Sequence, residues 1–367
     1  YGDHRDLHSF PTRRSPIFFL QNDTESAVYV CEKLFLLFHR FNFIIQVFQK
    51  QEENKTMENS KSSYVKIINE ICAEEGIMLS SYSYDWAFCL RKDQKRAFIL
   101  GYQFGLNPSS VRQVCNDKNI ASEVLKEEGI PSVYHACFMA PSMLQYTGGK
   151  GSWKALLSEL EKGTLVCKDN YGTGGNLVFK VRTQAELEQA ASDIYKSSEA
   201  MAVCRYEDIQ SEYRLVVLDG EIRLAFSKIR PSLTGDGVST VGKLLAEAIA
   251  KGQIHSFLVP NEAELSKVPS KGETYLLNWK HNLGQGASAL TLSIPDLEEE
   301  LVSLVKKTAK ALGIRFASID MIKTKAGWKV LEVNAGVMME HFASSGENQY
   351  ITAKAIYRDA ILKMFEG

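Results

Sequence analysis

Apolar positions recur at helical spacing along several stretches of the chain. Near the start of the readable region, Val65, Ile68 and Ile71 fall on one stripe, which is the pattern of an amphipathic helix. Polar residues that favour helix starts, and Gly or Pro at helix ends, mark further segments of this kind. The predicted helices cover residues 61–75, a segment beginning at 107, and residues 116–128, 153–162, 183–197, 240–251, 296–312 and 351–365.

Short runs of apolar and β-branched residues between these segments predict strands. Asp219-Gly220 is a strong hairpin turn between two of the runs, and residues 323–327 form a second link of hairpin length. The predicted strands cover residues 86–90, 97–104, 133–139, 164–168, 177–181, 200–204, 213–218, 221–229, 316–322 and 328–334.

These elements group into three units, as expected for a chain of 367 residues, which exceeds a single typical core. The predicted units are a short α/β lobe at 57–115, a central unit at 116–204 and a C-terminal unit at 205–367. Residues 1–56 differ from the rest. The first methionine is Met57, and part of the preceding segment resembles translated sequencing-adapter sequence. The hypothesis is that residues 1–56 are a misread upstream extension; an amphipathic helix that packs on the domain or on a partner is the alternative.

Composition narrows the class of protein. Hydrophobic residues make up 45%, charged residues 24%, and the net charge is -1, which describes an ordinary soluble globular protein. This balance predicts no nucleic-acid partner, and charges interrupt the one long apolar run at 27–48, so no membrane span is predicted. The seven cysteines are scattered and lack metal-ligand spacing, which fits a reducing cytoplasm.

The hairpin near the C-terminus carries a candidate metal site. Glu332 and Asn334 are two residues apart on one strand, so both side chains leave the same face. Asp320 lies on the partner strand, near enough to join them. Three hard oxygen ligands on such a platform suit Mg²⁺ held together with nucleotide phosphates. The alternative is a surface hairpin whose acids face water.

A glycine-rich turn supplies a candidate phosphate site. Lys168 ends a predicted strand, and Gly172, Gly174 and Gly175 follow it. Glycines let backbone N–H groups approach phosphate oxygens, and the lysine adds a positive charge. The segment is not a Walker loop, because no Gly-Lys-Ser/Thr follows. An ordinary Gly-rich turn beside a lysine is the alternative.

The order of these motifs resembles the ATP-grasp superfamily, especially its cyanophycin synthetase-like and glutathione synthetase-like branch. The resemblance spans roughly residues 62–367. It is carried by Asn116-Asp-Lys118 before a helix and Gly129-Ile-Pro131, Leu165-Val-Cys-Lys168 with the glycine loop, Glu212-Tyr-Arg214, the segment 228–245 with Gly235-Asp-Gly237, the segment 278–287 with Asn282, and the Asp320, Glu332 and Asn334 triad.

The resemblance implies an α/β (α+β) ATP-grasp fold, in which two α+β lobes clamp ATP behind a short α/β lobe. It assigns Asp320, Glu332 and Asn334 to Mg²⁺, with two ions expected and Mn²⁺ as an alternative. It assigns catalysis to Lys228, Arg214 and Asn282. The residues that it assigns to nucleotide binding are Lys118, Lys168, Gly172, Gly174, Gly175, Arg205, Tyr206, Glu207 and Glu212.

The chain departs from the family pattern at two positions. Cys204 stands where many relatives place Glu, although the adenine usually bonds to backbone groups there. Lys228 replaces an Arg, which keeps the charge but loses bidentate phosphate binding. Structural alternatives stay open: Arg214 and Lys228 could form an ion network with Glu212 or Asp236, and Lys118 could be a solvated helix-start residue. His281 is interpreted as a loop residue without a catalytic role.

The function implied is an ATP-dependent carboxylate–amine (or thiol) ligase that acts through an acyl phosphate. Its partners would be a small-molecule carboxylate, either an amino acid or a peptide, and an amine. Dimers are frequent among relatives, so a homodimer is the oligomeric state that the resemblance suggests. The alternatives are a phosphotransferase that acts on a hydroxyl group and a non-catalytic nucleotide-binding module.

Overall fold

The computed structural model describes residues 62–147, 151–254 and 260–366. Packing separates residues 61–367, as one compact unit, from residues 1–60. The hypothesis about residues 1–56 and Met57 therefore lies outside the described residues. In the part of the chain that is described, no helix has the length and apolar character to cross a membrane.

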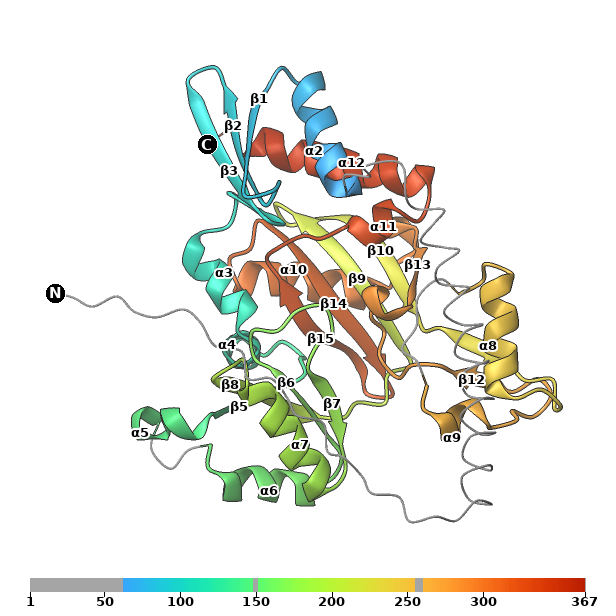
Figure 1. Cartoon of the computed structure of the whole chain (residues 1–367). Helices are drawn as coiled ribbons and strands as arrows, with labels where there is room; N and C mark the ends of the chain where they lie inside the picture. Colours follow the sequence, from blue (N-terminus) through green and yellow to red (C-terminus); the bar gives the residue numbers. More distant parts are fainter. Residues whose placement is uncertain (1–61, 148–150, 255–259, 367) are drawn as a thin grey trace, which may run out of the picture. The chain divides into compact units, whose positions relative to one another are not determined.

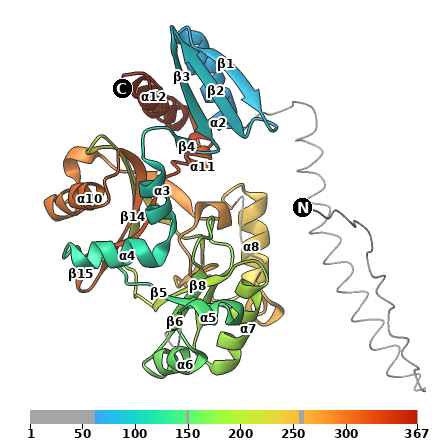
Figure 2. The same ribbon diagram turned by 90° about the vertical axis from the view of Figure 1, so that its left-hand side faces the viewer.

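The first lobe is an antiparallel sheet backed by helices. Its strand order is β1-β2-β3-β4, and α2 and the last helix of the chain, α12, pack beside each other next to it (Figures 1 and 2). Residues 64–106 and 337–361 share one hydrophobic core with the C-terminal sheet. The bounds are α2 (Ser63–Glu74), β1 (Met78–Tyr82), β2 (Ala87–Lys92), β3 (Lys95–Leu100), β4 (Gln103–Phe104) and α12 (Glu347–Lys363).

The central lobe is a second antiparallel sheet, with strand order β5-β8-β6-β7. Helices α6 and α7 bury the apolar side chains of one face. Two consecutive helices, α3 and α4, lead into this lobe (Figure 1). The bounds are α3 (Ser109–Asn116), α4 (Lys118–Glu127), β5 (Ala136–Met139), α5 (Leu144–Thr147), α6 (Trp153–Glu161), β6 (Leu165–Asp169), β7 (Val178–Val181), α7 (Gln184–Tyr195) and β8 (Ala200–Arg205).

The C-terminal lobe is built on a five-stranded antiparallel sheet, with strand order β13-β10-β9-β14-β15. Side chains of α10, α3 and α4 cover one of its faces. The bounds are β9 (Ser211–Leu218), β10 (Glu221–Ile229), β13 (Ser288–Thr291), α10 (Glu299–Ala311), β14 (Phe316–Thr324), β15 (Gly327–Asn334) and α11 (Glu340–Ala343). A small appendage with its own core holds β11 (Ser232–Thr234), α8 (Val241–Ala250), α9 (Glu262–Leu265) and β12 (Thr274–Leu276).

The other face of the large sheet changes character along each strand. Residues 212, 214, 216 and 218 of β9 alternate along the strand and therefore face the same side of the sheet. Val216 and Leu218 enter the core shared with the first lobe, whereas Glu212 and Arg214 are charged. A small apolar group, the hinge cluster, joins the central and C-terminal sheets beside these charges. Its buried members are Val133, Val166, Cys204 and Ile322. The charged end of the face therefore lies next to the junction of the two sheets.

The helices and strands expected from the hydrophobic pattern are present, with small shifts at their ends. One expected strand, 97–104, is broken into β3 and β4, because Gly101 turns the chain with φ +55° and the Trp86 ring fills the space that a Cβ would occupy. The pattern missed β1 and β11–β13, which are short, polar or half-exposed. The predicted domain boundaries at 115/116 and 204/205 stay predictions.

Candidate active site

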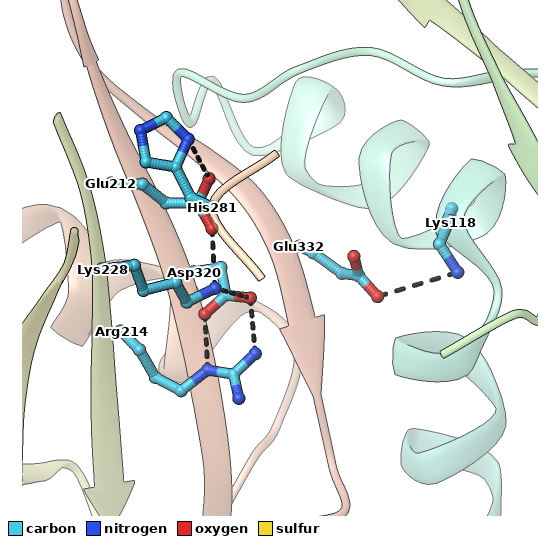
Figure 3. A network of polar contacts seen from close by, with 7 residues as sticks. All are labelled: Lys118, Glu212, Arg214, Lys228, His281, Asp320 and Glu332. Atoms are coloured by element: carbon cyan, nitrogen blue, oxygen red, sulfur yellow. Dashed lines mark hydrogen bonds and ion pairs between the residues drawn. The ribbon is translucent and has the colours of Figure 1, made fainter. Parts of the chain in front are cut away.

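A buried charge network lies at the polar end of the large sheet (Figure 3). Arg214 and Asp320 face each other on β9 and β14, and the guanidinium donates Nε and Nη2 hydrogen bonds of 2.7 and 2.8 Å to the two carboxylate oxygens. Lys228 of β10 places its ammonium 2.9 Å from Asp320 and 2.6 Å from Glu212. Two cations and two carboxylates thus share one site, held by three adjacent strands.

Burial and charge act in opposite directions on these groups. Burial raises the pKa of Asp320, but Arg214 and Lys228 outweigh burial and hold that pKa well below its usual range. For Glu212, burial prevails and raises the pKa, although Lys228 opposes it. Burial lowers the pKa of Arg214, yet Asp320 more than offsets this and raises it. Asp320 is therefore ionised, and the site keeps its positive charges.

His281 belongs to this network, which the sequence interpretation did not foresee. Its Nδ1 atom lies 3.4 Å from a carboxylate oxygen of Glu212, and its side chain is buried (Figure 3). Burial, together with Arg230 and Lys228, lowers the pKa of His281 to about 4. The imidazole is therefore neutral at pH 7. A lone histidine in a polar loop gives no sequence signal of such a position.

The structure brings the three predicted metal ligands onto one face of the β14–β15 hairpin. Asp320 of β14 pairs with Glu332 of β15. Two residues away on each strand, Ser318 pairs with Asn334, so the side chains of Asp320, Glu332 and Asn334 leave the same face. A register shift follows Asp320 and lets the side chain of Leu331 join those packed against the hinge cluster. No group of three His, Cys, Asp or Glu side chains poised for a metal occurs among the described residues. The triad has two carboxylates and one amide, an oxygen donor set that fits Mg²⁺.

Lys118 and Lys168 approach this hairpin from the central lobe. Lys118 begins α4, and its ammonium lies 3.7 Å from Glu332 (Figure 3). The same ammonium donates a 2.6 Å hydrogen bond to the Gly172 carbonyl. Burial lowers the pKa of Lys118, while Glu332 opposes the shift. Lys168 at the end of β6 is buried, and no hydrogen bond or ion pair within the described ranges engages its ammonium. An unpaired buried ammonium is costly unless a negative ligand meets it.

The glycine-rich loop lies between Lys118 and the loop at 278–287. Gly174 and Gly175 both have positive φ, +69° and +74°, which only glycine adopts without strain. The Gly175 carbonyl accepts hydrogen bonds from Lys280 and Gln285, and a Cβ on Gly175 would lie 3.0 Å from the Asn282 amide nitrogen. Asn282 thus lies against the glycine-rich loop, and its catalytic role stays a prediction.

Three predicted nucleotide-binding residues, Arg205, Tyr206 and Glu207, follow one another in the chain but turn their side chains to different partners. Tyr206 packs against the hinge cluster, with the Lys180 ammonium 3.4 Å from its ring centroid and the Trp279 ring 6.1 Å away. Glu207 pairs with Lys329 of β15 at 2.8 Å. The Arg205 side chain instead turns to Glu159 of α6 at 2.7 Å and does not join the charge network.

The comparisons with known proteins agree with this arrangement. Residues 271–356 match the family described as RimK-like ATP-grasp domain. The structure resembles a bifunctional glutathione synthetase from Pasteurella multocida, with a TM-score of 0.51 and 16% identity over 82% of this chain and 43% of that chain. The unit has an ATP-grasp fold. The fold predicted from the sequence is thereby confirmed.

The sequence relatives of this ATP-grasp unit include the two kinds of enzyme that the resemblance suggested, glutathione and cyanophycin synthesis enzymes. The glutathione biosynthesis bifunctional protein GshAB of Lactiplantibacillus plantarum is 23% identical over 59% of this chain and 30% of its own length. Cyanophycin synthetase of Nostoc sp. is 23% identical over 64% of this chain and 27% of its own length. Tetrahydromethanopterin:alpha-L-glutamate ligase of Methanocaldococcus jannaschii is 37% identical over 22% of this chain and 26% of its own length. The chain spans less than a third of the length of these curated relatives.

Near the two lysines and the 278–287 loop, several buried polar atoms have no hydrogen-bond partner among the residues that the structure describes. They are His135 Nε2, Asn170 Nδ2, Asn278 Nδ2 and Gln285 Oε1. The pKa of His135 is well below its usual value because of burial and the nearby Lys168 and Lys118. Buried polar atoms are normally bonded, so these four are available to a polar ligand or to water. Asn278 and Gln285 lie in the segment 278–287 that carries the resemblance, but none of the four residues was singled out from the sequence as a site residue.

Proposed function

We propose that this chain is an ATP-dependent carboxylate–amine (or thiol) ligase that releases ADP and phosphate. One observation carries the proposal: the Asp320 and Glu332 hairpin, the Arg214 and Lys228 cations, and Lys118 beside the glycine loop converge from both lobes. The names of the sequence relatives, which include glutathione and cyanophycin synthesis enzymes, support the same activity.

The nucleotide would lie between the two sheets. The hinge cluster and Tyr206 offer an apolar surface for the base, and the backbone at Arg205 to Glu207 offers polar groups beside it. Lys118, Lys168 and the glycine-loop amides would bind the phosphates. Asp320, Glu332 and Asn334 would hold Mg²⁺, and Asp320 would then share its carboxylate with Arg214 and Lys228. When bound, Mg²⁺ supplies positive charge to the β- and γ-phosphate oxygens.

Two chemical steps follow from this placement. A carboxylate oxygen of the acceptor attacks the γ-phosphorus, the bond to the bridging oxygen breaks, and ADP leaves with an acyl phosphate formed. An amine nitrogen then attacks the acyl carbon and loses a proton, and inorganic phosphate leaves. Arg214 and Lys228 would stabilise charge on the transferred phosphoryl group. The glycine loop would exclude water from the acyl phosphate.

An ADP-release screen tests the proposal. The full chain is mixed with ATP, Mg²⁺ and a panel of amino acids and short peptides, and hydroxylamine is added to trap an acyl phosphate as a hydroxamate. We expect ADP only with an acceptor carboxylate, and a hydroxamate only with that acceptor. Asp320→Asn should reduce turnover by at least about 100-fold, because it removes a carboxylate that would hold Mg²⁺ and that pairs with Arg214 and Lys228.

The alternatives give different outcomes in the same screen. A phosphotransferase would give a stable phosphorylated product without any amine. A binding module would bind ATP without releasing ADP. Two Mg²⁺ ions, the Mn²⁺ alternative, the homodimer and the cytoplasmic location stay predictions from the sequence.

A further inference from the structure

The Gly175 carbonyl is held by two side chains of the loop that carries Asn282. Lys280 donates a 3.1 Å hydrogen bond from Nζ, and Gln285 donates a 3.0 Å hydrogen bond from Nε2. These two residues are named the latch pair below. Both lie more than 100 positions along the chain from Gly175, so the contacts join the central lobe to the C-terminal lobe.

The contact is close as well as polar. With φ +74°, Gly175 presents its carbonyl from a conformation that other residues rarely adopt. An added Cβ would lie 3.1 Å from the Gln285 amide nitrogen and 3.0 Å from that of Asn282. Any side chain at this position would therefore push the two loops apart.

The opposite end of the glycine loop is fixed by a different element. Lys118 at the start of α4 donates to the Gly172 carbonyl at 2.6 Å and to the Asn170 carbonyl at 3.2 Å. The loop is consequently held at Gly172 by the start of α4 and at Gly175 by the latch pair. Release of the second contact alone would leave the loop attached at one end.

The latch pair is built for this contact. Gln285 ends a short 3₁₀ turn, Leu283–Gln285, and both latch side chains are largely withdrawn from water. The Gly175 carbonyl is the one hydrogen-bond acceptor of Lys280 Nζ found in the described part of the chain, and no carboxylate there pairs with this ammonium. Burial lowers the pKa of Lys280, since no such charge offsets it.

We infer that Lys280 and Gln285 are positioning residues that keep the glycine loop closed over the phosphates and tie its closure to the order of the 278–287 loop, which carries Asn282. The inference rests on the proposed function, because that proposal assigns the glycine loop to the phosphates. Its consequence is that ATP is protected from water when both loops are in place. Loss of the latch would separate ADP release from product formation.

Hydrogen exchange of residues 169–178 tests the latch without any turnover. We compare the full chain with Lys280→Met, Gln285→Met and the double variant, none with nucleotide added. Each lost hydrogen bond should lower the equilibrium constant for closing the loop by about two- to tenfold. Amides of residues 169–178 should therefore exchange about tenfold faster in the double variant. Lys280→Arg keeps a donor and should restore slow exchange, and the exposed Lys271→Met is the matched control.

Gly175→Ala approaches the same contact from the other side and should also speed exchange, which keeps the test decisive if one latch variant fails to fold. With ATP, Mg²⁺ and the acceptor found in the screen, the latch variants should release about two or more ADP per product, against one for the unchanged chain. Unchanged exchange in a folded double variant, or a ratio that stays at one, would overturn the inference. Faster exchange with no turnover by any variant or by the parent chain would support the latch and reject the proposed function.

Discussion

At the scale of single residues, charge pairing explains most of the site. Asp320 and Lys228 are buried and Arg214 is partly buried, and each charge is stabilised there by its neighbours on the adjacent strands. Lys228 meets both Glu212 and Asp320 as a point charge, a geometry that suits an ammonium as well as a guanidinium. The replacement of Arg by Lys at this position is therefore compatible with the network.

His281 predicts a pH dependence of stability. Its pKa is about 4 in the folded chain, below the ordinary value of 6.5, so the unfolded chain binds more protons between these values. Stability from this residue is fully present above pH 6.5 and is lost as the pH falls towards 4. Between pH 7 and pH 5, the free energy of unfolding should fall by about 1–2 kcal/mol less in His281→Asn than in the parent. Urea unfolding at both pH values measures this.

The exposed His341→Asn is the control for that comparison, and its curve should follow that of the parent. Parallel curves for the parent and His281→Asn would contradict the assignment. Baselines at pH 8 separate this effect from the lost contact with Glu212, because His281 is neutral there in both the folded and the unfolded chain.

The site shows how far residue patterns reach. Asp320, Glu332 and Asn334 could be placed on one face from the alternation of two strands and a hairpin link, and the structure has that arrangement. The contacts of Lys280, Gln285 and His135 could not be predicted, because they arise where segments distant in the sequence meet in the fold. The functional roles assigned to all of these residues stay predictions.

At the scale of elements, helix starts and strand faces follow local rules, but their partners do not. Helices such as α4 and α7 begin at the expected polar residues, Asp117 and Thr183, whose side chains cap them. The short strands β11 and β12 could not be predicted, because they pair only with each other and depend on the appendage core. Local pattern therefore indicated the type of the long elements and missed the short ones.

Helix α2 has a cap that the local sequence does not reveal. The carboxylate of Glu340 accepts hydrogen bonds from the backbone N–H groups of Ser63 and Tyr64, at 2.7 and 2.8 Å. Glu340→Ala would leave both groups without this acceptor and should destabilise the unit by about 1–2 kcal/mol. Urea unfolding measures the loss, and hydrogen exchange should localise it to the first turn of α2.

The matched control is Glu347→Ala, which removes an exposed carboxylate from the first turn of α12. It should change the free energy of unfolding by less than about 0.5 kcal/mol. Equal effects of the two substitutions would show that Glu340 does not act as a remote cap.

At the scale of the whole unit, Tyr357 connects α12 to the segment that follows β15. Its buried hydroxyl accepts from the Met339 N–H at 2.9 Å and donates to the Val337 carbonyl at 2.8 Å. Tyr357→Phe removes both bonds and leaves two buried backbone groups unsatisfied, which should cost about 2–3 kcal/mol. Thermal unfolding followed by two spectroscopic probes would measure the loss and show whether the unit still unfolds in one transition.

Tyr84→Phe provides the reference, since that side chain is fully exposed. It should leave the unfolding curve unchanged. A Tyr357→Phe variant as stable as the parent would mean that water replaces the lost hydroxyl.

The core of the first lobe unites side chains from residues 64–106 with others from 337–361. During synthesis, the early residues leave the ribosome long before the late ones exist. The sheet formed by β1 to β4 must therefore wait, with part of its apolar surface uncovered, until residues 337–361 have also been made. During this delay, the uncovered surface is exposed to aggregation.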